Sequence, residues 1–281
     1  MRHRRGCMRT PARRRRPRLA FTPGCARSSA LRRISQRRLV CLTAPVQRPL
    51  ALGQEVAWSG AQRPGRAPLR GAHVLVRPVD AENDAEPLFA ASHPPAGEEA
   101  MWTYLPDGPY ESAEHLRRML EWAAGTDDAV YFTLAPLPEE RPLGMAAYLR
   151  ITPEFGVIEI GHIWLSEGLR RTTAATEAIY LLARHVFDDL GYRRLEWKCN
   201  ALNAASRRAA ERFGFAFEGG FRKHQVVKGR NRDTAWYAIT DEQWPSIGSG
   251  FRAWLVPENF DRAGRQLRAL GELIGAAREP A

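Results

Sequence analysis

The sequence predicts an α+β domain with a mixed sheet, and three observations support that fold class. Apolar runs of strand length come first along the chain, at 73–79, 130–135, 143–151 and 157–165. After the last of them, the pattern reads helix, strand, helix and hairpin as far as residue 239. No internal repeat indicates a solenoid. Strands that lead into such a succession are typical of α+β domains.

The composition is that of a soluble globular protein, but the charge is unevenly distributed. The 281 residues are 44% hydrophobic and 26% charged, with a formal net charge of +11. Residues 1–72 contain 18 Arg and one acidic residue, which gives +17. Residues 73–281 contain 24 Lys and Arg against 30 Asp and Glu, which gives −6. The basicity therefore belongs to the N-terminal segment, and the folded part is expected to be mildly acidic.

Residues 1–72 are expected to form an Arg-rich, disordered extension. The segment has no sustained apolar period, so burial cannot offset its ordering entropy. Its last stretch, GAQRPGRAPLRG, has the composition of a linker. Four interpretations stay open: a nucleic-acid arm, an organelle transit peptide, a membrane-surface anchor, or a non-functional extension.

Cysteine spacing and hydropathy indicate no metal site and no membrane span. Cys7, Cys25, Cys41 and Cys199 match neither a zinc site nor a disulfide framework. Cys199 lies in an apolar strand and is expected to be a small buried side chain. No apolar run approaches the roughly 20 residues that a bilayer span needs. We expect a protein of the reducing cytoplasm, with no membrane partner.

The first half of the domain follows from local patterns. A strand over 73–79 ends near a proline, and Asp80 then begins a helix over 81–92 that Pro87 weakens. The aromatic loop MWTYLPDGPY precedes a helix that Ser112 begins, in which apolar residues recur at three- and four-residue spacing. The stretch PLPEERP predicts a hairpin loop between the next two strands.

The second half of the domain is also predicted from local patterns. The strand over 157–165 is almost continuously apolar, which predicts a central position in the sheet. A helical period covers 172–190 and ends at Gly191, and a strand and a short helix follow. The runs 215–221 and 233–239 predict a hairpin joined by the basic turn KGRNR, Lys228–Arg232, which is expected to be solvated. From residue 241 the chain is expected to be helical, including a weakly amphipathic segment over 262–277.

Five motifs in this order resemble the GNAT superfamily of acetyl-CoA-dependent N-acyltransferases, in its branch of RimJ/RimL-type ribosomal-protein alanine N-acetyltransferases. They are VLVRPV, WTYLPDGPY, EIGHIWLS with the turn after it, NAASRRAAERFGF and GRNRDTAWYAI. The resemblance covers roughly 74–244. It implies a mostly antiparallel sheet, flanked by helices, in which two strands splay apart to form a cleft for coenzyme A. No metal is implied.

The turn before the helix at 172 is expected to hold the pyrophosphate of coenzyme A. The resemblance implies a Gln/Arg-x-x-Gly-x-Gly/Ala pattern, here Arg170, Thr173 and Ala175. Thr173 stands where the pattern has a glycine. A glycine would let the backbone approach the phosphate closely and would tolerate positive φ. Backbone amides at a helix start favour phosphate. The expected ligands are Arg170, Arg171, Thr172, Thr173, Ala174 and Ala175.

The helix at 203 supplies the next two expected residues. Asn203 matches the family's pantetheine-contacting asparagine and is also a good N-cap. Ser206 matches a hydroxyl that lies near the thioester sulfur. Many family members place a tyrosine as general acid seven residues after the asparagine, but this chain has Ala210 there. Ser206 is therefore the expected proton donor.

The strand over 157–165 is expected to carry the base and the oxyanion site. Glu159 matches an acid in related enzymes and is the preferred base, and His162 is the rival by residue type. Strand alternation would place these two on opposite faces. Backbone amides of Ile163, Trp164 and Leu165 are expected to stabilise the thioester oxygen.

The expected function is acetyl transfer from acetyl-CoA to a primary amine by direct attack in a ternary complex. Trp102, Tyr104 and Tyr110 are expected to wall the acceptor pocket. The domain is expected to span 73–247, followed by a helical extension over 248–281. The alternatives are a non-catalytic acyl-CoA-binding protein, and a nucleic-acid-associated protein that acts through residues 1–72.

Overall fold

The computed structural model describes residues 50–277. The chain divides into two units, Met1–Glu55 and Val56–Ala281. Of the first unit, residues 50–55 are exposed and belong to no helix or strand. The three N-terminal cysteines and most of the Arg-rich segment lie outside the described residues. The second unit contains the whole sheet.

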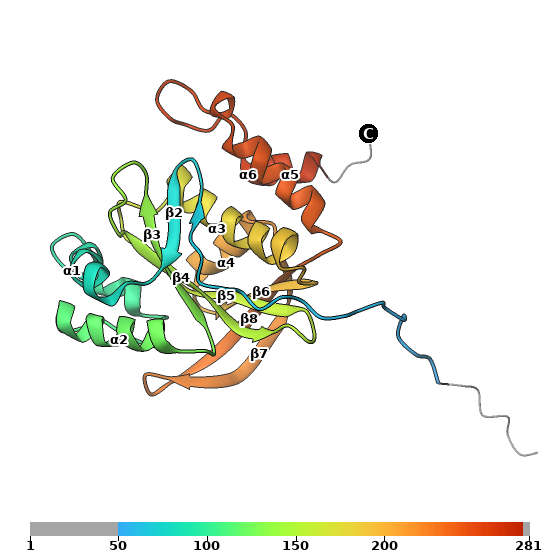
Figure 1. Ribbon diagram of the computed structural model, residues 1–281, viewed down its shortest axis with the longest axis horizontal. Coiled ribbons are helices and arrows are strands. Elements are labelled where there is room, and N and C mark those ends of the chain that lie inside the picture. Colours follow the sequence, from blue (N-terminus) through green and yellow to red (C-terminus); the bar gives the residue numbers. More distant parts are fainter. Residues whose placement is uncertain (1–49, 278–281) are drawn as a thin grey trace, which may run out of the picture. The chain divides into compact units, whose positions relative to one another are not determined.

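Within residues 50–277, eight strands form one sheet in the order β1-β2-β3-β4-β5-β6-β8-β7. Neighbouring strands are antiparallel except for β5 and β6, which are parallel. The expected mixed, mostly antiparallel sheet is therefore confirmed (Figure 1). The strands are β1 (Leu69–Arg70), β2 (Val74–Pro78), β3 (Val130–Pro136), β4 (Gly144–Thr152), β5 (Val157–Leu165), β6 (Arg194–Asn200), β7 (Ala216–Val227) and β8 (Arg230–Thr240).

The helices lie in the predicted places, with small changes at their ends. Asp80 and Ser112 cap their helices as expected, each through a side-chain oxygen that accepts from backbone N–H groups. The helix predicted over 172–190 is α-helical in its first part and finishes as a π-helical turn over His185–Asp189. The α-helices are α1 (Ala81–Ser92), α2 (Ala113–Gly125), α3 (Thr173–Arg184), α4 (Ala204–Arg212), α5 (Trp244–Leu255) and α6 (Leu270–Ala276).

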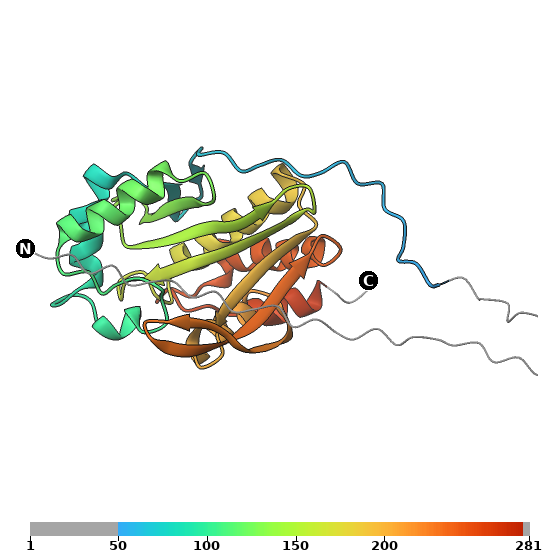
Figure 2. The same ribbon diagram turned by 90° about the horizontal axis from the view of Figure 1, so that it is seen from below.

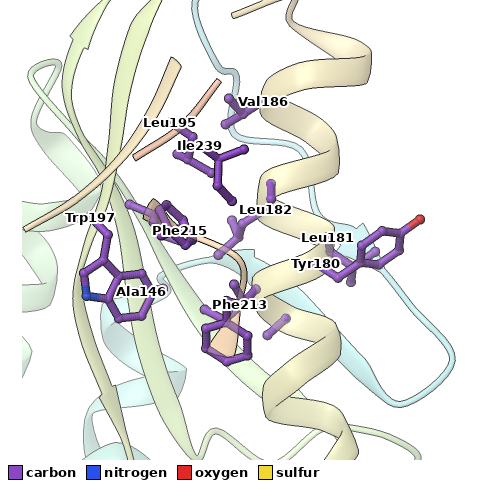
Figure 3. Packing of buried hydrophobic residues seen from close by; sticks show 14 of the residues in the cluster. Ala146, Tyr180, Leu181, Leu182, Val186, Leu195, Trp197, Phe213, Phe215 and Ile239 are labelled. Carbon is purple, nitrogen blue, oxygen red and sulfur yellow. The ribbon is translucent and has the colours of Figure 1, made fainter. Parts of the chain in front are cut away.

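Helices lie on both faces of the sheet (Figures 1 and 2). Two hydrophobic clusters of buried side chains join them to the strands. The larger joins α3, α5 and α6 to the strands, and in Figure 3 Leu182 and Val186 point toward Leu195 and Ile239. The smaller joins α1 and α2 to β3 and β4, and includes Trp102. Because residues of β4 alternate between the two clusters, this strand is buried on both faces.

The parallel strands β5 and β6 separate after three residue pairs. Their register runs from Val157 opposite Arg194 to Glu159 opposite Glu196, and stops there. Both strands continue well beyond this point, β5 to Leu165 and β6 to Asn200. The edge of β5 that faces β6 is therefore unpaired along its second half. This is the splayed pair of strands that the sequence predicted.

The C-terminal segment is part of the domain, so the predicted boundary at 247/248 is wrong. That boundary falls inside α5, whose Phe251 and Trp254 belong to the larger core cluster together with Leu270 and Ile274. The predicted helix over 262–277 begins only at Leu270, because residues 261–269 form a loop. Packing of α5 against α3, and of α6 against α5, gives this segment the same core as the sheet.

The prediction that the disordered extension ends at residue 72 is also wrong. Residues 58–72 lie against the domain: the Trp58 indole donates to the carbonyl of Glu154 (2.8 Å), and Leu69–Arg70 pairs with β2. Buried Glu177 of α3 accepts from the N–H groups of Ala72, His73 and Val74 at 2.9, 2.6 and 3.1 Å. The Gly/Pro composition misled because these contacts form with residues distant in sequence.

The hairpin strands are longer than predicted. The turn consists of Lys228 and Gly229, and most of the basic run expected to form a turn continues as β8. The residues of β7 are mainly exposed, which explains why the segment lacks the apolar alternation that predicts a strand.

Removal of residues 1–72 deletes Trp58, β1 and one donor to Glu177, all of which removal of residues 1–55 leaves in place. We therefore expect the longer truncation to cost about 2 kcal/mol more than the shorter one, or about 4–8 °C in melting temperature. Differential scanning calorimetry of both truncated chains measures the difference. Equal melting temperatures would contradict the packing described for residues 58–72.

Candidate active site

A β-bulge in β5 determines the geometry of the cleft. Opposite Met145 of β4 lies Trp164, and opposite Ala147 lies Gly161, so β5 contains one extra residue in this interval. His162 in that interval has a left-handed backbone, with φ of +49°. An extra residue of this kind reverses the alternation of side chains beyond it.

The bulge places Glu159 and His162 on the same face, so the expectation of opposite faces is wrong. Before it, Ile160 packs in the larger cluster, and after it Ile163 does so. Glu159 precedes Ile160 and His162 precedes Ile163, and both side chains therefore lie on the opposite face, where Trp164 joins the smaller cluster. The period-two rule failed here because it assumes a strand without an inserted residue.

Two backbone amides of β5 point to its unpaired edge. The N–H of Ser166 donates to the carbonyl of Leu143 at 2.9 Å, which directs it to β4. Because backbone groups alternate along a strand, the N–H groups of Leu165 and Ile163 point the other way, into the cleft toward β6. The N–H of Trp164 faces β4. Of the three amides expected for the thioester oxygen, two are thus available.

Glu159 belongs to a buried ion-pair network rather than standing free. Its carboxylate accepts from Lys198 Nζ at 2.9 Å and from Arg150 at 2.6 Å. The same Lys198 ammonium contacts Glu196 at 2.6 Å and lies 3.9 Å from the centre of the Trp236 ring. Only 6% of the Lys198 side chain and 4% of the Glu159 side chain are exposed. The charges therefore neutralise one another at the point where β5 and β6 part.

The turn between β5 and α3 leaves three backbone donors free. The N–H groups of Arg170, Thr172 and Ala175 are used within the turn, since they donate to Ser166, Leu169 and the Thr172 hydroxyl. Within residues 50–277, the N–H groups of Arg171, Thr173 and Ala174 donate to no protein acceptor. Three free amides at the start of a helix form an anion-binding site.

The replacement of glycine by Thr173 does not strain this turn. Thr172 is the N-cap and Thr173 is the first helical residue, whereas the left-handed residue is Arg171, with φ of +61°. The cost of positive φ therefore falls on an exposed arginine. A hollow of about 320 Å³ beside the turn is lined in part by Ser166, Arg170 and Arg171, and the buried Ser166 hydroxyl has no partner.

Arg212 of α4 adds a cation beside the same helix start. Its guanidinium donates to the Thr176 hydroxyl at 3.2 Å and lies 5.1 and 5.2 Å from the ring centres of Phe213 and Trp254. Burial lowers the pKa of this guanidinium. No carboxylate pairs with it in the part of the chain that the structure describes. Arg212 was not predicted, because an arginine in a charged helix gives no distinct sequence signal.

The helix start at 203 meets β6 at the cleft. Asn203 accepts the N–H of Ser206 at 3.0 Å through its side-chain oxygen, so it is the N-cap and its amide nitrogen stays available. The Ser206 hydroxyl accepts from the Trp197 indole at 3.0 Å. Burial raises the pKa of the nearby Cys199 thiol, which is 6% exposed as the sequence predicted. Ala210 is fully buried.

A hollow of about 450 Å³ lies on the face that His162 shares with Glu159. Its lining consists of Pro106, Asp107, Met119, Trp122, Tyr131, Leu149 and His162. Trp102 and Tyr110 do not line this hollow, because both are buried in the smaller cluster at 0% and 6% exposure. Tyr104 is partly exposed and donates to the carbonyl of Leu202 at 3.3 Å.

The tip of the β7–β8 hairpin holds the loop that carries Asp107. Lys228 Nζ donates to the carbonyls of Trp102, Asp107 and Gly108 at 2.8, 3.0 and 2.5 Å. Burial lowers the pKa of this ammonium. The turn is exposed, as expected, but Lys228 also connects two segments more than 100 residues apart through these hydrogen bonds.

Comparison with known proteins identifies the family of this fold and cleft. The model of the acetyltransferase (GNAT) domain family matches residues 73–216. The chain belongs to the GNAT acetyltransferase family. A GCN5-related N-acetyltransferase from Brucella melitensis is 43% identical, with a TM-score of 0.76 over 78% of this chain and 99% of its own. A GNAT-family structure from Chromobacterium violaceum is 38% identical, with a TM-score of 0.65 over 70% of this chain and 99% of its own.

More distant GNAT structures share the fold. An acetyl transferase from Salmonella typhimurium, which modifies the N-terminal serine of a 50S ribosomal subunit protein, is 19% identical, with a TM-score of 0.53 over 62% of this chain and 99% of its own. No curated protein sequence matches the chain. Within residues 50–277, no helix is long and apolar enough to cross a membrane. In that same range no three metal-binding side chains cluster.

We expect Lys198→Met to destabilise this GNAT domain by about 3–5 kcal/mol, because it leaves Glu159 and Glu196 buried and close together without their shared cation. The matched control is Arg265→Met, which removes an 81%-exposed cation from Asp261 and should cost at most about 1 kcal/mol. Urea unfolding of both variants measures the two costs. Similar small values would show that the network does not hold the splayed strands.

Proposed function

We propose that the protein is an acetyl-CoA-dependent N-acetyltransferase that transfers acetyl to a primary amine within a ternary complex. The observation that carries the proposal is the splay of β5 from β6, which leaves two strand amides facing one cleft. Membership of the GNAT family supports acetyl-CoA as the cosubstrate. The free amides at the start of α3 supply the anion site that a pyrophosphate needs.

The residues around the α3 turn fit a phosphate group. The buried Ser166 hydroxyl without a partner and the free N–H groups of Arg171, Thr173 and Ala174 are donors that lack acceptors. Arg170, Arg171 and Arg212 bring positive charge to the same helix start. We propose that the pyrophosphate binds here and that Asn203 contacts the pantetheine arm through its amide nitrogen.

We propose the following transfer. The neutral amine attacks the thioester carbonyl, whose oxygen accepts from the N–H groups of Ile163 and Leu165. The carbon–sulfur bond then breaks, and Ser206 gives its hydroxyl proton to the thiolate. A thiolate whose parent thiol has a pKa near 8.5 is a fair leaving group, so a weak donor suffices. The indole of Trp197, which donates to Ser206, leaves the serine proton free for this transfer.

The acceptor is proposed only as a primary amine. The Salmonella enzyme, which acts on a protein N-terminus, shares the fold alone with this chain, so a protein N-terminus and a small amine both stay open. Glu159 as the base stays a prediction, since two cations occupy its carboxylate. The acyl-CoA-binding alternative is tested by the same assays, and the nucleic-acid alternative depends on residues outside the described range.

We expect acetyl-CoA to raise the melting temperature of the wild-type chain, since a ligand present at 100 times its Kd stabilises by about 2.7 kcal/mol. Arg171→Gly should raise the stability of the free protein by about 1 kcal/mol, because glycine relieves the left-handed residue. It should weaken acetyl-CoA binding by removing a charge at the phosphate site. Thermal shift and calorimetric titration check both effects. No stabilisation of the wild type by acetyl-CoA would overturn the proposed function.

We expect Ser206→Ala to lower kcat by about 100-fold or more, the usual contribution of a positioned proton donor. Binding of acetyl-CoA should change little, because Asn203 and the α3 turn are untouched. Thiol release under single-turnover conditions measures the chemical step. Unchanged turnover in this variant would remove Ser206 from the acid role while leaving the rest of the proposal in place.

A further inference from the structure

The imidazole of His162 is the one titratable side chain of β5 that no ion pair engages. Its Nε2 is buried and has no hydrogen-bond partner, whereas the neighbouring Glu159 is held by Lys198 and Arg150. A buried polar atom without a partner costs free energy unless a ligand or water supplies one. The left-handed backbone at His162 adds a further cost. Both costs fall on His162, which is one of the residues that line the hollow of about 450 Å³.

The surroundings of His162 keep its ring neutral. Tyr131 of β3 contacts it edge-on, with ring centres 5.3 Å apart, and Leu149 of β4 and Trp122 of α2 complete the apolar wall. Asp107 is the only carboxylate that lines this hollow. Burial lowers the pKa of His162, and Asp107 opposes this effect. Burial also raises the pKa of Tyr131, so its phenol stays protonated.

The hollow has the size and lining of a small-ligand site. Its volume of about 450 Å³ lies in the range of ligand pockets, and most of its wall is aromatic or aliphatic. Asp107 provides one charge that attracts an ammonium group. Lys228 fixes the loop of Asp107 through three backbone carbonyls, so the backbone that carries this carboxylate is held by a residue that does not itself line the hollow.

We infer that this hollow is the acceptor site, that His162 takes the proton of the attacking amine, and that the acceptor is a primary amine next to an apolar group. The inference rests on the proposed acetyl transfer. As the nitrogen–carbon bond forms, one amine proton passes to the imidazole, and as the carbon–sulfur bond breaks, the thiolate takes a proton from Ser206. The imidazolium releases its proton to solvent, and solvent reprotonates the serine, so the protons balance.

The first test replaces the base without disturbing the bulge. His162→Asn suits this purpose because asparagine tolerates a left-handed backbone. We expect kcat/KM for the amine to fall by about 100-fold or more, with the calorimetric Kd for acetyl-CoA unchanged. Added imidazole should restore part of the rate. The control His185→Asn, at an imidazole that pairs with Asp189 outside the hollow, should change neither value by more than about twofold.

The pH profile gives a second readout that needs no variant. A neutral imidazole is required, so wild-type kcat/KM should fall with decreasing pH through a pKa below the ordinary histidine value of about 6.5. This acid limb should disappear in His162→Asn. A fall of less than about threefold in the variant, or an acid limb that persists in it, overturns the inference. A wild-type profile without an acid limb does so even if the variant does not fold.

The second test addresses the acceptor class with wild-type protein. The panel contains 2-phenylethylamine, a peptide with an N-terminal leucine, a peptide with an N-terminal aspartate, and spermine. The first two carry an amine beside an apolar group and distinguish a free amine from a peptide N-terminus. We expect kcat/KM for one of them to exceed that for the last two by at least about tenfold, a difference of about 1.4 kcal/mol. A preference for spermine or the acidic peptide overturns the assigned class.

The third test separates positioning from folding. Lys228→Met should raise KM for the amine several-fold with little change in the Kd for acetyl-CoA, because it frees only the loop of Asp107. An unchanged KM overturns the positioning role. A wild-type protein that binds acetyl-CoA but acetylates no amine of the panel overturns the proposed function and this inference together. Turnover of His162→Asn that stays within about threefold of the wild-type value overturns the inference alone.

Discussion

The cleft depends on the two buried ion pairs that the Lys198 ammonium forms with Glu159 and Glu196. This ammonium joins two parallel strands at their last paired position and satisfies two carboxylates that would otherwise repel each other. A pair of strands that separates inside a sheet exposes backbone groups that normally hydrogen-bond to each other. The ion pairs keep the strands together up to this point, and beyond it the exposed amides become the binding surface.

Two further features position side chains at this cleft: the bulge in β5 and the contacts of Lys228. The bulge at His162 turns the second half of β5 over, so that the imidazole and Glu159 share a face while Ile163 and Leu165 keep the core packed. At the tip of the β7–β8 hairpin, Lys228 holds the loop of Asp107, which is more than 100 residues away in the sequence. Strain at the bulge and desolvation at the lysine are both costs that the surrounding packing offsets. Residues that carry such costs are often found at functional sites.

Much of the site could be read from local sequence because its parts are continuous in the chain. The cap at Asn203, the helix start at Thr172 and the apolar strand before it are each short patterns, and the structure contains all three. The resemblance to GNAT acetyltransferases supplied the link between them. What it did not supply is Asp107, Arg212 and Lys228, whose contacts join segments that no local pattern connects.

The sequence by itself determined the order of the elements, the class of the fold and the family, because hydrophobic period and capping residues act over a few neighbours. Only the tertiary structure decided which side chains face each other. A single inserted residue at His162 reversed the alternation of side chains in the second half of β5. The segments 58–72 and 244–276 pack on the core through contacts with elements distant in the sequence. Such effects depend on register and on long-range packing, which composition and spacing do not encode.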